Sequence, residues 1–152
     1  MLAKKMVYLI LFSMVMFSVP ASAETEAQTT TAKGLFIELT SDSMFKVRRA
    51  FQVGTMVRKH HDIPVLINIS LGASRFADKT LPLAAEAIKV RGSTVHEMMS
   101  NFIAAGGEVY ICPMCMMGNG VANEDLLDGI KVGGPDVVLP RLLEDGVKTL
   151  SY

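Results

Sequence analysis

Two short runs of almost purely apolar residues limit the folds that this chain can adopt. The first is Leu35–Leu39, and the second is Val65–Leu71, which is rich in β-branched side chains. A strand with one face in solvent alternates apolar and polar residues, whereas near-continuous apolar runs are typical of strands that are covered on both faces. We therefore expect a parallel sheet with helices on both sides.

Helical patterns lie between and after these runs. From Met44 to Val57 apolar or small residues recur with the period of one helical face, and the basic residues at 58–61 suit a helix C-terminus. A second helix is marked by the capping-box pair Thr94 and Glu97 and by an apolar stripe that stops at Gly106. A third, short helix is expected over 83–90.

The C-terminal part of the chain supplies further strands and helices. We expect strands at 108–111, 129–132 and 147–152, a short helix capped by Asn123, and a helix over 135–145. Pro140 requires this last helix either to begin late or to bend. The total of about five strands with intervening helices predicts a three-layer α/β/α sandwich with a mainly parallel sheet.

The N-terminus has the features of a secretory signal peptide. Lys4 and Lys5 precede an apolar run, and Ala21-Ser22-Ala23 provides small residues at a cleavage site. We predict a cleaved signal peptide over 1–23, a flexible leader over 24–33 and one domain over 34–152. An uncleaved anchor helix is the alternative, but the run is short for a membrane span.

Export implies a periplasmic or secreted protein with no membrane partner once the signal is removed. Without Lys4 and Lys5, the basic residues fall below the 15 acidic ones, so the mature chain carries a small negative net charge. Nothing in this charge pattern indicates nucleic-acid binding.

The only two cysteines of the chain form the motif Cys112-Pro113-Met114-Cys115, directly after the expected strand at 108–111. Ligands and catalytic groups gather at the carboxyl ends of strands in parallel sheets. A disulfide across two intervening residues closes too small a loop to add much stability. We therefore predict that Cys112 and Cys115 form a reactive site, with a structural disulfide and a buried, inert cysteine as the alternatives.

Several chemistries fit this motif. Thiol–disulfide exchange is one, because the motif resembles that of glutaredoxins, although its late place in the chain excludes their fold. Binding of Cu(I) is another, with the thiolates supported by the thioethers of Met114, Met116 and Met117. In that case the methionines act as ligands, whereas the alternative is that they fill gaps in packing.

Persulfide carriage is a further possibility, because a thiolate at a strand end under backbone N–H groups is nucleophilic. A second cysteine can then resolve the persulfide by forming a disulfide. The last alternative is an oligomeric scaffold without chemistry. His60, His61 and His96 are too distant in sequence to be assigned as ligands, and a helix end accounts for the first two.

The C-terminal half resembles the DsrE/DsrF-like sulfur-relay family. Its members share a strand that ends in cysteine, a following stretch of the form G-(I/V/L)-x-x-E-D-L-x-x-G and a closing strand. The corresponding residues here are Gly107–Met116, Gly120-Val121, Glu124–Ile130 and Lys148–Tyr152. The resemblance extends over 34–152 and is strongest from Thr94 onward.

This resemblance implies a parallel α/β/α sandwich, a homo-trimer or homo-hexamer, and a cysteine that passes sulfur between donor and acceptor proteins or small sulfur compounds, without a cofactor. In the family the reactive cysteine matches either position; we favour Cys115, expected in the Gly-rich turn, with Cys112 as its resolving partner. Whether the chain acts as a sulfurtransferase or only as a carrier is left open. Export departs from the cytoplasmic location of the best-known members.

Overall fold

Five strands form one sheet in the computed structural model, which describes residues 31–81 and 92–152. The strand order is β4-β3-β2-β1-β5, and every neighbouring pair is parallel. The strands are β1 (Gly34–Leu39), β2 (Val65–Ile69), β3 (Glu108–Ile111), β4 (Lys131–Val132) and β5 (Val147–Ser151). The parallel sheet predicted from the apolar runs is thus confirmed.

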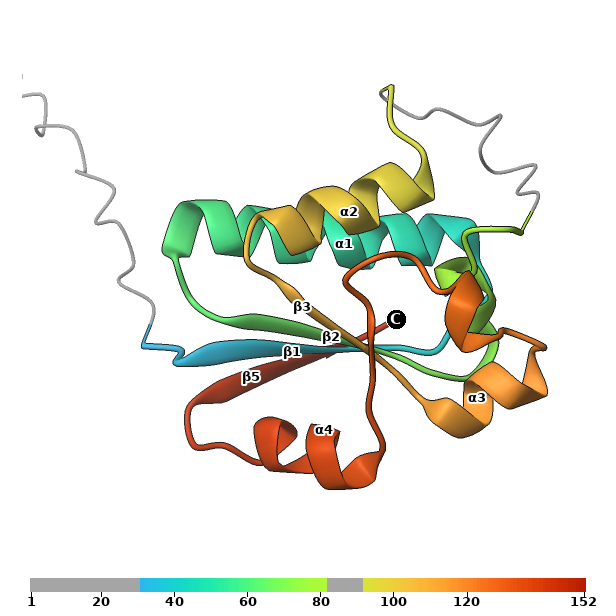
Figure 1. Cartoon of the computed structure of the whole chain (residues 1–152). Helices are drawn as coiled ribbons and strands as arrows, with labels where there is room; N and C mark the ends of the chain where they lie inside the picture. The colour runs from blue at the N-terminus through green and yellow to red at the C-terminus, as the bar shows by residue number, and fades with distance from the viewer. Residues whose placement is uncertain (1–30, 82–91) are drawn as a thin grey trace, which may run out of the picture.

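Helices cover both faces of this sheet (Figure 1). Helices α1 (Met44–His61) and α2 (Val95–Ala104) lie on one face, and α4 (Pro135–Leu142) lies on the other. Three short elements follow strand ends or loops, namely the 3-10 helices η1 (Leu71–Ala77) and η2 (Asn123–Asp125) and the helix α3 (Pro113–Gly118). The arrangement is the predicted three-layer α/β/α sandwich.

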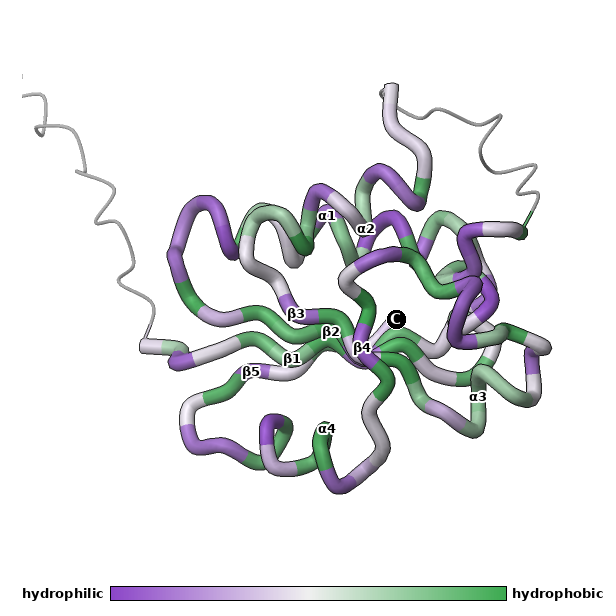
Figure 2. The backbone as a smooth tube through the Cα atoms, viewed as in Figure 1, coloured by the Kyte–Doolittle hydropathy of each residue, from purple (hydrophilic) through white to green (hydrophobic). Residues whose placement is uncertain are grey.

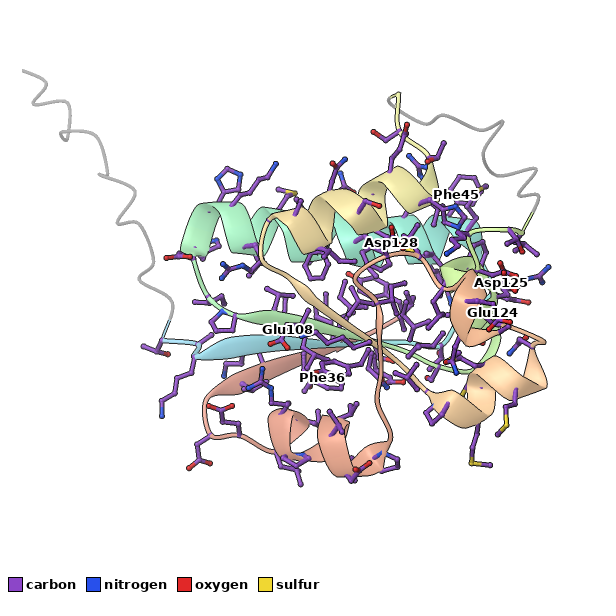
Figure 3. All side chains as sticks on the ribbon, viewed as in Figure 1. Phe36, Phe45, Glu108, Glu124, Asp125 and Asp128 are labelled. Atoms are coloured by element: carbon purple, nitrogen blue, oxygen red, sulfur yellow. The ribbon has the colours of Figure 1, made fainter. Side chains whose placement is uncertain are left out.

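Alternation along the buried strands divides the core between the two faces. Leu35, Ile37 and Leu39 of β1 join the large cluster under α1 and α2, whereas Phe36 joins the smaller cluster with Leu66 and Val138 under α4. Figure 3 shows Phe36 between the sheet and α4. Hydrophobic residues therefore make up most of the central strands β1 and β2, as Figure 2 shows by colour. This is the reason for the near-continuous apolar runs in the sequence.

The start of α2 has the capping box that its sequence predicts. Thr94 Oγ1 accepts the backbone N–H of Glu97 at 3.1 Å, and Glu97 Oε2 accepts the backbone N–H of Thr94 at 2.6 Å. Two otherwise unpaired donors of the first helical turn are thereby satisfied. α2 then contributes Phe102, whose ring meets that of Phe51 on α1 edge-on, with the centroids 5.7 Å apart.

Several of the predicted elements are shorter or begin differently in the structure. α4 begins at Pro135 and ends at Leu142 rather than at 145, with Pro140 inside it. Pro140 has no N–H to donate to the preceding turn, so the helix ends soon after it. Residue Asn123 begins η2, and its side chain does not cap it. The strand expected over 129–132 is reduced to β4.

Several predictions fall on residues that the structure does not describe. The signal peptide over 1–23, most of the leader and the helix expected over 83–90 lie outside the described residues. Within 31–81 and 92–152, none of the helices combines the length and the hydropathy needed to cross a membrane.

Candidate functional site

Both cysteines lie at the carboxyl edge of the sheet, next to the segment that follows β2. The backbone N–H of Cys112 donates to the carbonyl of Ile69 at 3.0 Å, so Cys112 continues the β2–β3 pairing by one residue. The chain then turns into α3, which lies beyond the strand ends (Figure 1). Both cysteines are free thiols and partly exposed. The predicted place of Cys112, at the end of its strand, matches the structure.

Cys115 lies in a helix, not in the glycine-rich turn in which the sequence placed it. Cys112 is the N-cap of α3, and its Sγ accepts the backbone N–H of Cys115 at 3.3 Å. Pro113 takes the first helical position, where proline is favoured because no N–H is required there. The turn at Gly118–Gly120 follows only after this helix, so the motif itself forms the first helical turn.

The thiol of Cys115 has a set of neighbours that favour its protonated form. Burial raises the pKa of Cys115 above its ordinary value of 9.0, and the hydrogen bond that it makes with Cys112 raises this pKa further. The charges of Cys112 and Glu38 act in the same direction, while a hydrogen bond from the backbone N–H of Leu71 opposes them. Taken together, these neighbours favour the protonated form of Cys115.

The backbone N–H that donates to the Cys115 thiol belongs to Leu71. This residue has a backbone conformation that non-glycine residues rarely adopt. Leu71, the first residue of η1, has φ +48°, and the residue is 62 % exposed. A left-handed conformation costs a non-glycine residue about 1 kcal/mol, and such residues cluster at functional sites. Sequence reasoning missed Leu71, because its importance depends on the packing of η1 against α3.

A buried serine and an asparagine connect η1 with α3 through hydrogen bonds. The hydroxyl of Ser74, which is fully buried, contacts the carbonyls of Leu71 at 2.8 Å and Cys115 at 3.1 Å. Asn119, at the end of α3, donates from Nδ2 to the same two carbonyls and to Ser74 Oγ, at 2.9–3.0 Å. These bonds hold the Leu71 N–H in place beside the cysteine pair.

A carboxylate lies behind this loop at the same edge of the sheet. Glu38 of β1 accepts from Asn68 Nδ2 at 2.8 Å and, through a short hydrogen bond, from the hydroxyl of Ser70, the residue before Leu71. The Oδ1 of Asn68 is buried and has no hydrogen-bond partner in the described part of the chain. The sequence signalled Glu38 only as the polar residue that interrupts the first apolar run.

The three methionines of the motif have different surroundings. Met116 is buried in the core, whereas Met114 and Met117 of α3 are 76 % and 74 % exposed. Of the five residues in the predicted copper site, Met116 therefore has a packing role, and the copper alternative stays a prediction. Among the described residues, no three His, Cys, Asp or Glu side chains are grouped so that they could hold a metal ion.

The three histidines do not form a cluster with the two cysteines in the described part of the chain. His60 and His61 are exposed in the last turn of α1, as the basic run predicted. His96 of α2 is buried, and its Nε2 lies 3.0 Å from the carbonyl oxygen of Phe76 in η1. Its role is to join α2 to the segment that carries Leu71.

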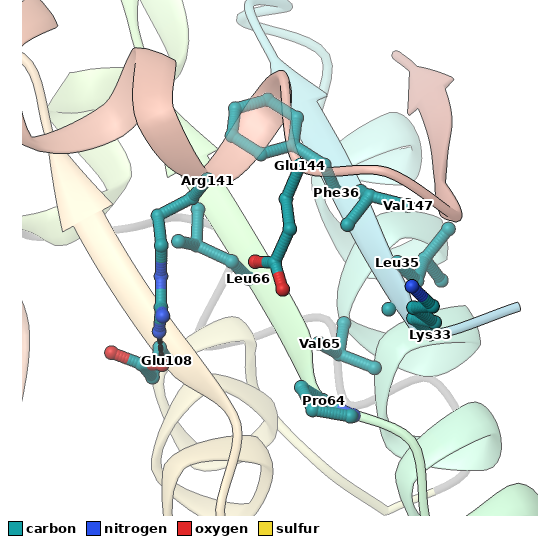
Figure 4. Close-up of a pocket in the computed structure, with 11 residues that line it drawn as sticks. Lys33, Leu35, Phe36, Pro64, Val65, Leu66, Glu108, Arg141, Glu144 and Val147 are labelled. Atoms are coloured by element: carbon teal, nitrogen blue, oxygen red, sulfur yellow. Dashed lines mark hydrogen bonds and ion pairs between the residues drawn. The ribbon is translucent and has the colours of Figure 1, made fainter.

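Two of the hollows among the described residues illustrate how the concave surfaces lie away from the cysteines. One, of about 230 Å³, lies at the amino end of the strands between the sheet and α4, and Figure 4 shows its lining. There Glu108 pairs with Arg141, and its other oxygen lies 3.3 Å from Lys131 Nζ. The second, of about 650 Å³, runs between α1 and α2 past His60. Neither includes Cys112 or Cys115, so the candidate site is the surface edge formed by α3 and η1.

Solved structures share this fold. The YchN protein from E. coli aligns with a TM-score of 0.61 and 16 % identity, over 78 % of this chain and 99 % of its own. MTH1491 from Methanobacterium thermoautotrophicum, a protein of unknown function, gives 0.60 and 13 %, over 78 % and 98 %. BT1422 from Bacteroides thetaiotaomicron, a conserved protein of unknown function, gives 0.56 and 19 %, over 79 % and 95 %.

The three neighbours share the α/β/α fold of this chain. At these identities the likeness concerns the fold alone. No protein-family model matches the sequence, and no curated protein matches it.

Proposed function

We propose that this chain, on the DsrE/DsrF-like fold, is an exported sulfur-handling protein that carries persulfide sulfur on the pair Cys112 and Cys115. The fold and the position of the pair at the carboxyl edge of a parallel sheet support the proposal. The residue resemblance of the C-terminal half supports it independently of the fold.

One observation carries the assignment of roles within the pair. Cys112 Sγ accepts the backbone N–H of Cys115, and the thiol of Cys115 is the donor in the hydrogen bond between the two side chains. A thiolate at Cys112 therefore keeps both bonds, whereas a thiolate at Cys115 loses the one it donates. A thiolate is the attacking form in sulfur chemistry. We assign sulfur uptake to Cys112 and resolution to Cys115.

The proposed cycle balances without a cofactor. The Cys112 thiolate attacks the outer sulfur of a donor persulfide, R–S–SH, forming Cys112–S–SH and releasing R–S⁻. An acceptor thiolate then takes the outer sulfur and returns Cys112 to the thiolate. In the absence of an acceptor, Cys115 attacks the inner sulfur of Cys112–S–SH, which gives the Cys112–Cys115 disulfide and H₂S. A dithiol reductant then supplies the two electrons that reopen the disulfide.

Intact mass spectrometry of the mature protein after treatment with polysulfide tests both the function and the assignment. We expect whole sulfur atoms to be gained by Cys115→Ser, which cannot resolve the persulfide, and not by Cys112→Ser. Wild type should lose two hydrogen atoms, because Cys115 resolves its persulfide to the disulfide when no acceptor is present. Sulfur gained by Cys112→Ser and not by Cys115→Ser would instead support the sequence-based preference for Cys115. No sulfur adduct on any of the three proteins would refute persulfide carriage.

Thiol–disulfide exchange is the second candidate, favoured by the hydrogen bond between the two thiols, which brings them within reach of each other. In the same experiment this function predicts a loss of two hydrogen atoms in wild type alone, without a sulfur adduct in any variant. Copper that stays bound to wild type through gel filtration, and is lost in both cysteine variants, would support the metal-binding alternative.

The partners and the location belong to this proposal as well. We propose a homo-trimer or homo-hexamer, which the exposed apolar residues Leu139 of α4 and Leu143 just after it support, since such side chains favour association. Sulfur donor and acceptor proteins would meet the exposed α3 edge. Fractionation of cells that express the full chain, together with the N-terminal sequence of the mature protein, tests export and cleavage before Glu24.

A further inference from the structure

The hollow between α1 and α2 is lined by potential metal ligands that the cysteine site does not use. It has a volume of about 650 Å³, and its lining includes Met56 and His60 of α1 and Met98 of α2. The two helices lie side by side on the same face of the sheet (Figure 1). Two thioethers and one imidazole from neighbouring helices therefore line one cavity.

The spacing of Met56 and His60 suits a shared ligand. The two residues are four positions apart within α1. Side chains at this spacing lie one above the other on the same helical face, with their Cβ atoms about 5–6 Å apart. His61, the next residue, lies about 100° further round the helix and is not part of the lining. One metal ion can therefore be bound by the Met56 sulfur and an imidazole nitrogen of His60.

These donors are available to a ligand. Met56 is 51 % exposed although it is apolar, and His60 is exposed as well. In the described part of the chain, the His60 imidazole makes no hydrogen bond and no ion pair. Met98 is partly buried and packs against the large core cluster, which fixes the α2 side of the hollow.

The charges around the hollow favour a univalent cation over a divalent one. Among the described residues no carboxylate lines it, whereas the lysine Lys59 does. A lysine ammonium repels a divalent ion more strongly than a univalent one, and neutral donors do not compensate for this. His60 lies in the last turn of α1, where the helix dipole places partial negative charge and stabilises a cation.

We propose that Met56, His60 and Met98 form a binding site for the soft univalent ion Cu(I), separate from the cysteine pair. Thioethers are soft ligands that select Cu(I), and imidazole also suits copper. The site needs only one His and no Cys or carboxylate, so it differs in kind from a cluster of three His, Cys, Asp or Glu side chains, which the described residues lack. It does not depend on persulfide carriage.

Cu(I) titration of a Cys112→Ser/Cys115→Ser protein tests this site without competition from the thiols. The mature protein is kept under nitrogen with ascorbate, and the coloured Cu(I) chelator bathocuproine disulfonate competes for the ion. We expect one Cu(I) to bind per chain. Met56→Leu, His60→Gln and Met98→Leu in this background should each weaken binding about tenfold or more, because even the loss of an outer-shell partner costs a metal site that much.

His61→Gln and Met117→Leu are the matched controls. His61 is an exposed histidine in the same turn of α1 but outside the hollow, and Met117 is an exposed methionine on α3. Both substitutions should leave the affinity for Cu(I) unchanged. Circular dichroism confirms that each variant is folded, and the exchange of methionine for leucine conserves side-chain volume.

Ag(I) provides a direct readout of thioether binding, because it is a soft univalent ion that stays in one oxidation state. The NMR signals of the methionine methyl groups are assigned through the leucine variants. We expect the signals of Met56 and Met98 to move when Ag(I) is added. The signal of Met44, at the opposite end of α1, should stay in place.

The proposal is overturned when the double-cysteine variant binds no Cu(I), or when the three lining variants bind it as tightly as His61→Gln does. Copper that binds to wild type and not to the double-cysteine variant would assign the metal to the cysteine motif instead. Failure of the proposed function has a different signature, since the absence of a sulfur adduct in the mass experiment has no bearing on Cu(I) binding by a protein without cysteines.

Discussion

Cys112 and Cys115 are one helical turn apart but have unlike surroundings. Cys112 Sγ receives a backbone N–H as the cap of α3, whereas Cys115 has a raised pKa caused first by its burial. The charge of Glu38 on β1 adds to this difference, whereas the backbone N–H of Leu71 in η1 opposes it. Two chemically identical side chains therefore have unlike surroundings, and the two-step reaction proposed above would use this asymmetry.

Ser74 connects η1 with α3 through the hydrogen bonds of its hydroxyl. Ser74→Ala removes a fully buried hydroxyl that contacts Leu71, Cys115 and Asn119. We expect a loss of about 1–2 kcal/mol in the free energy of unfolding, measured by urea denaturation, because buried partners lose a hydrogen bond. Ser100→Ala, at an exposed position on α2, should change the midpoint little. A midpoint equal to that of wild type would contradict the role given to Ser74.

At the scale of elements, α3 shows where prediction from the local sequence fails. Glycines at 118 and 120 suggested a turn around Cys115, but Pro113 starts a helix before them and Cys112 caps it. A cysteine as the N-cap is not among the usual signals, which are Ser, Thr, Asp and Asn, so the helix was missed. By contrast, the capping box of α2 follows the usual rule, and its prediction was confirmed.

That capping box gives a prediction about α2. Thr94→Ala removes the acceptor of the Glu97 N–H and should lower the free energy of unfolding by about 1 kcal/mol. Asn101→Ala, in the exposed interior of the same helix, should act in the opposite direction, because alanine has the higher helix propensity. Thermal unfolding followed by circular dichroism measures both. Equal effects of the two substitutions would show that the cap does not stabilise α2.

At the scale of the whole molecule, the sheet and its layers could be predicted, whereas the composition of the site could not. Apolar runs identified the buried strands, and the strand-end rule placed Cys112 at the carboxyl edge of the sheet. The strand order, however, decides which other residues meet there. Glu38 and Leu71 belong to β1 and to the segment after β2, and only the pairing of β1, β2 and β3 brings them to the cysteines.

The stability of the whole domain should report the state of Cys115 as the pH rises. The folded protein raises the pKa of this thiol above 9.0, so the unfolded chain, with an ordinary thiol, loses its proton first. Unfolding then releases a proton, and the contribution of Cys115 to stability is complete below pH 9.0 and is lost as the pH rises through the folded value.

We therefore expect the free energy of unfolding to fall more steeply above pH 9.0 in wild type than in Cys115→Ser, which cannot titrate there. Urea denaturation under reducing conditions, from neutral pH to about pH 10.5, gives the difference between the two proteins. Taking this difference removes the contribution of lysines and tyrosines, which titrate in both. Parallel curves would mean that Cys115 has the same proton affinity in the folded and unfolded chain, and the asymmetry of the pair would then have to arise from Cys112 alone.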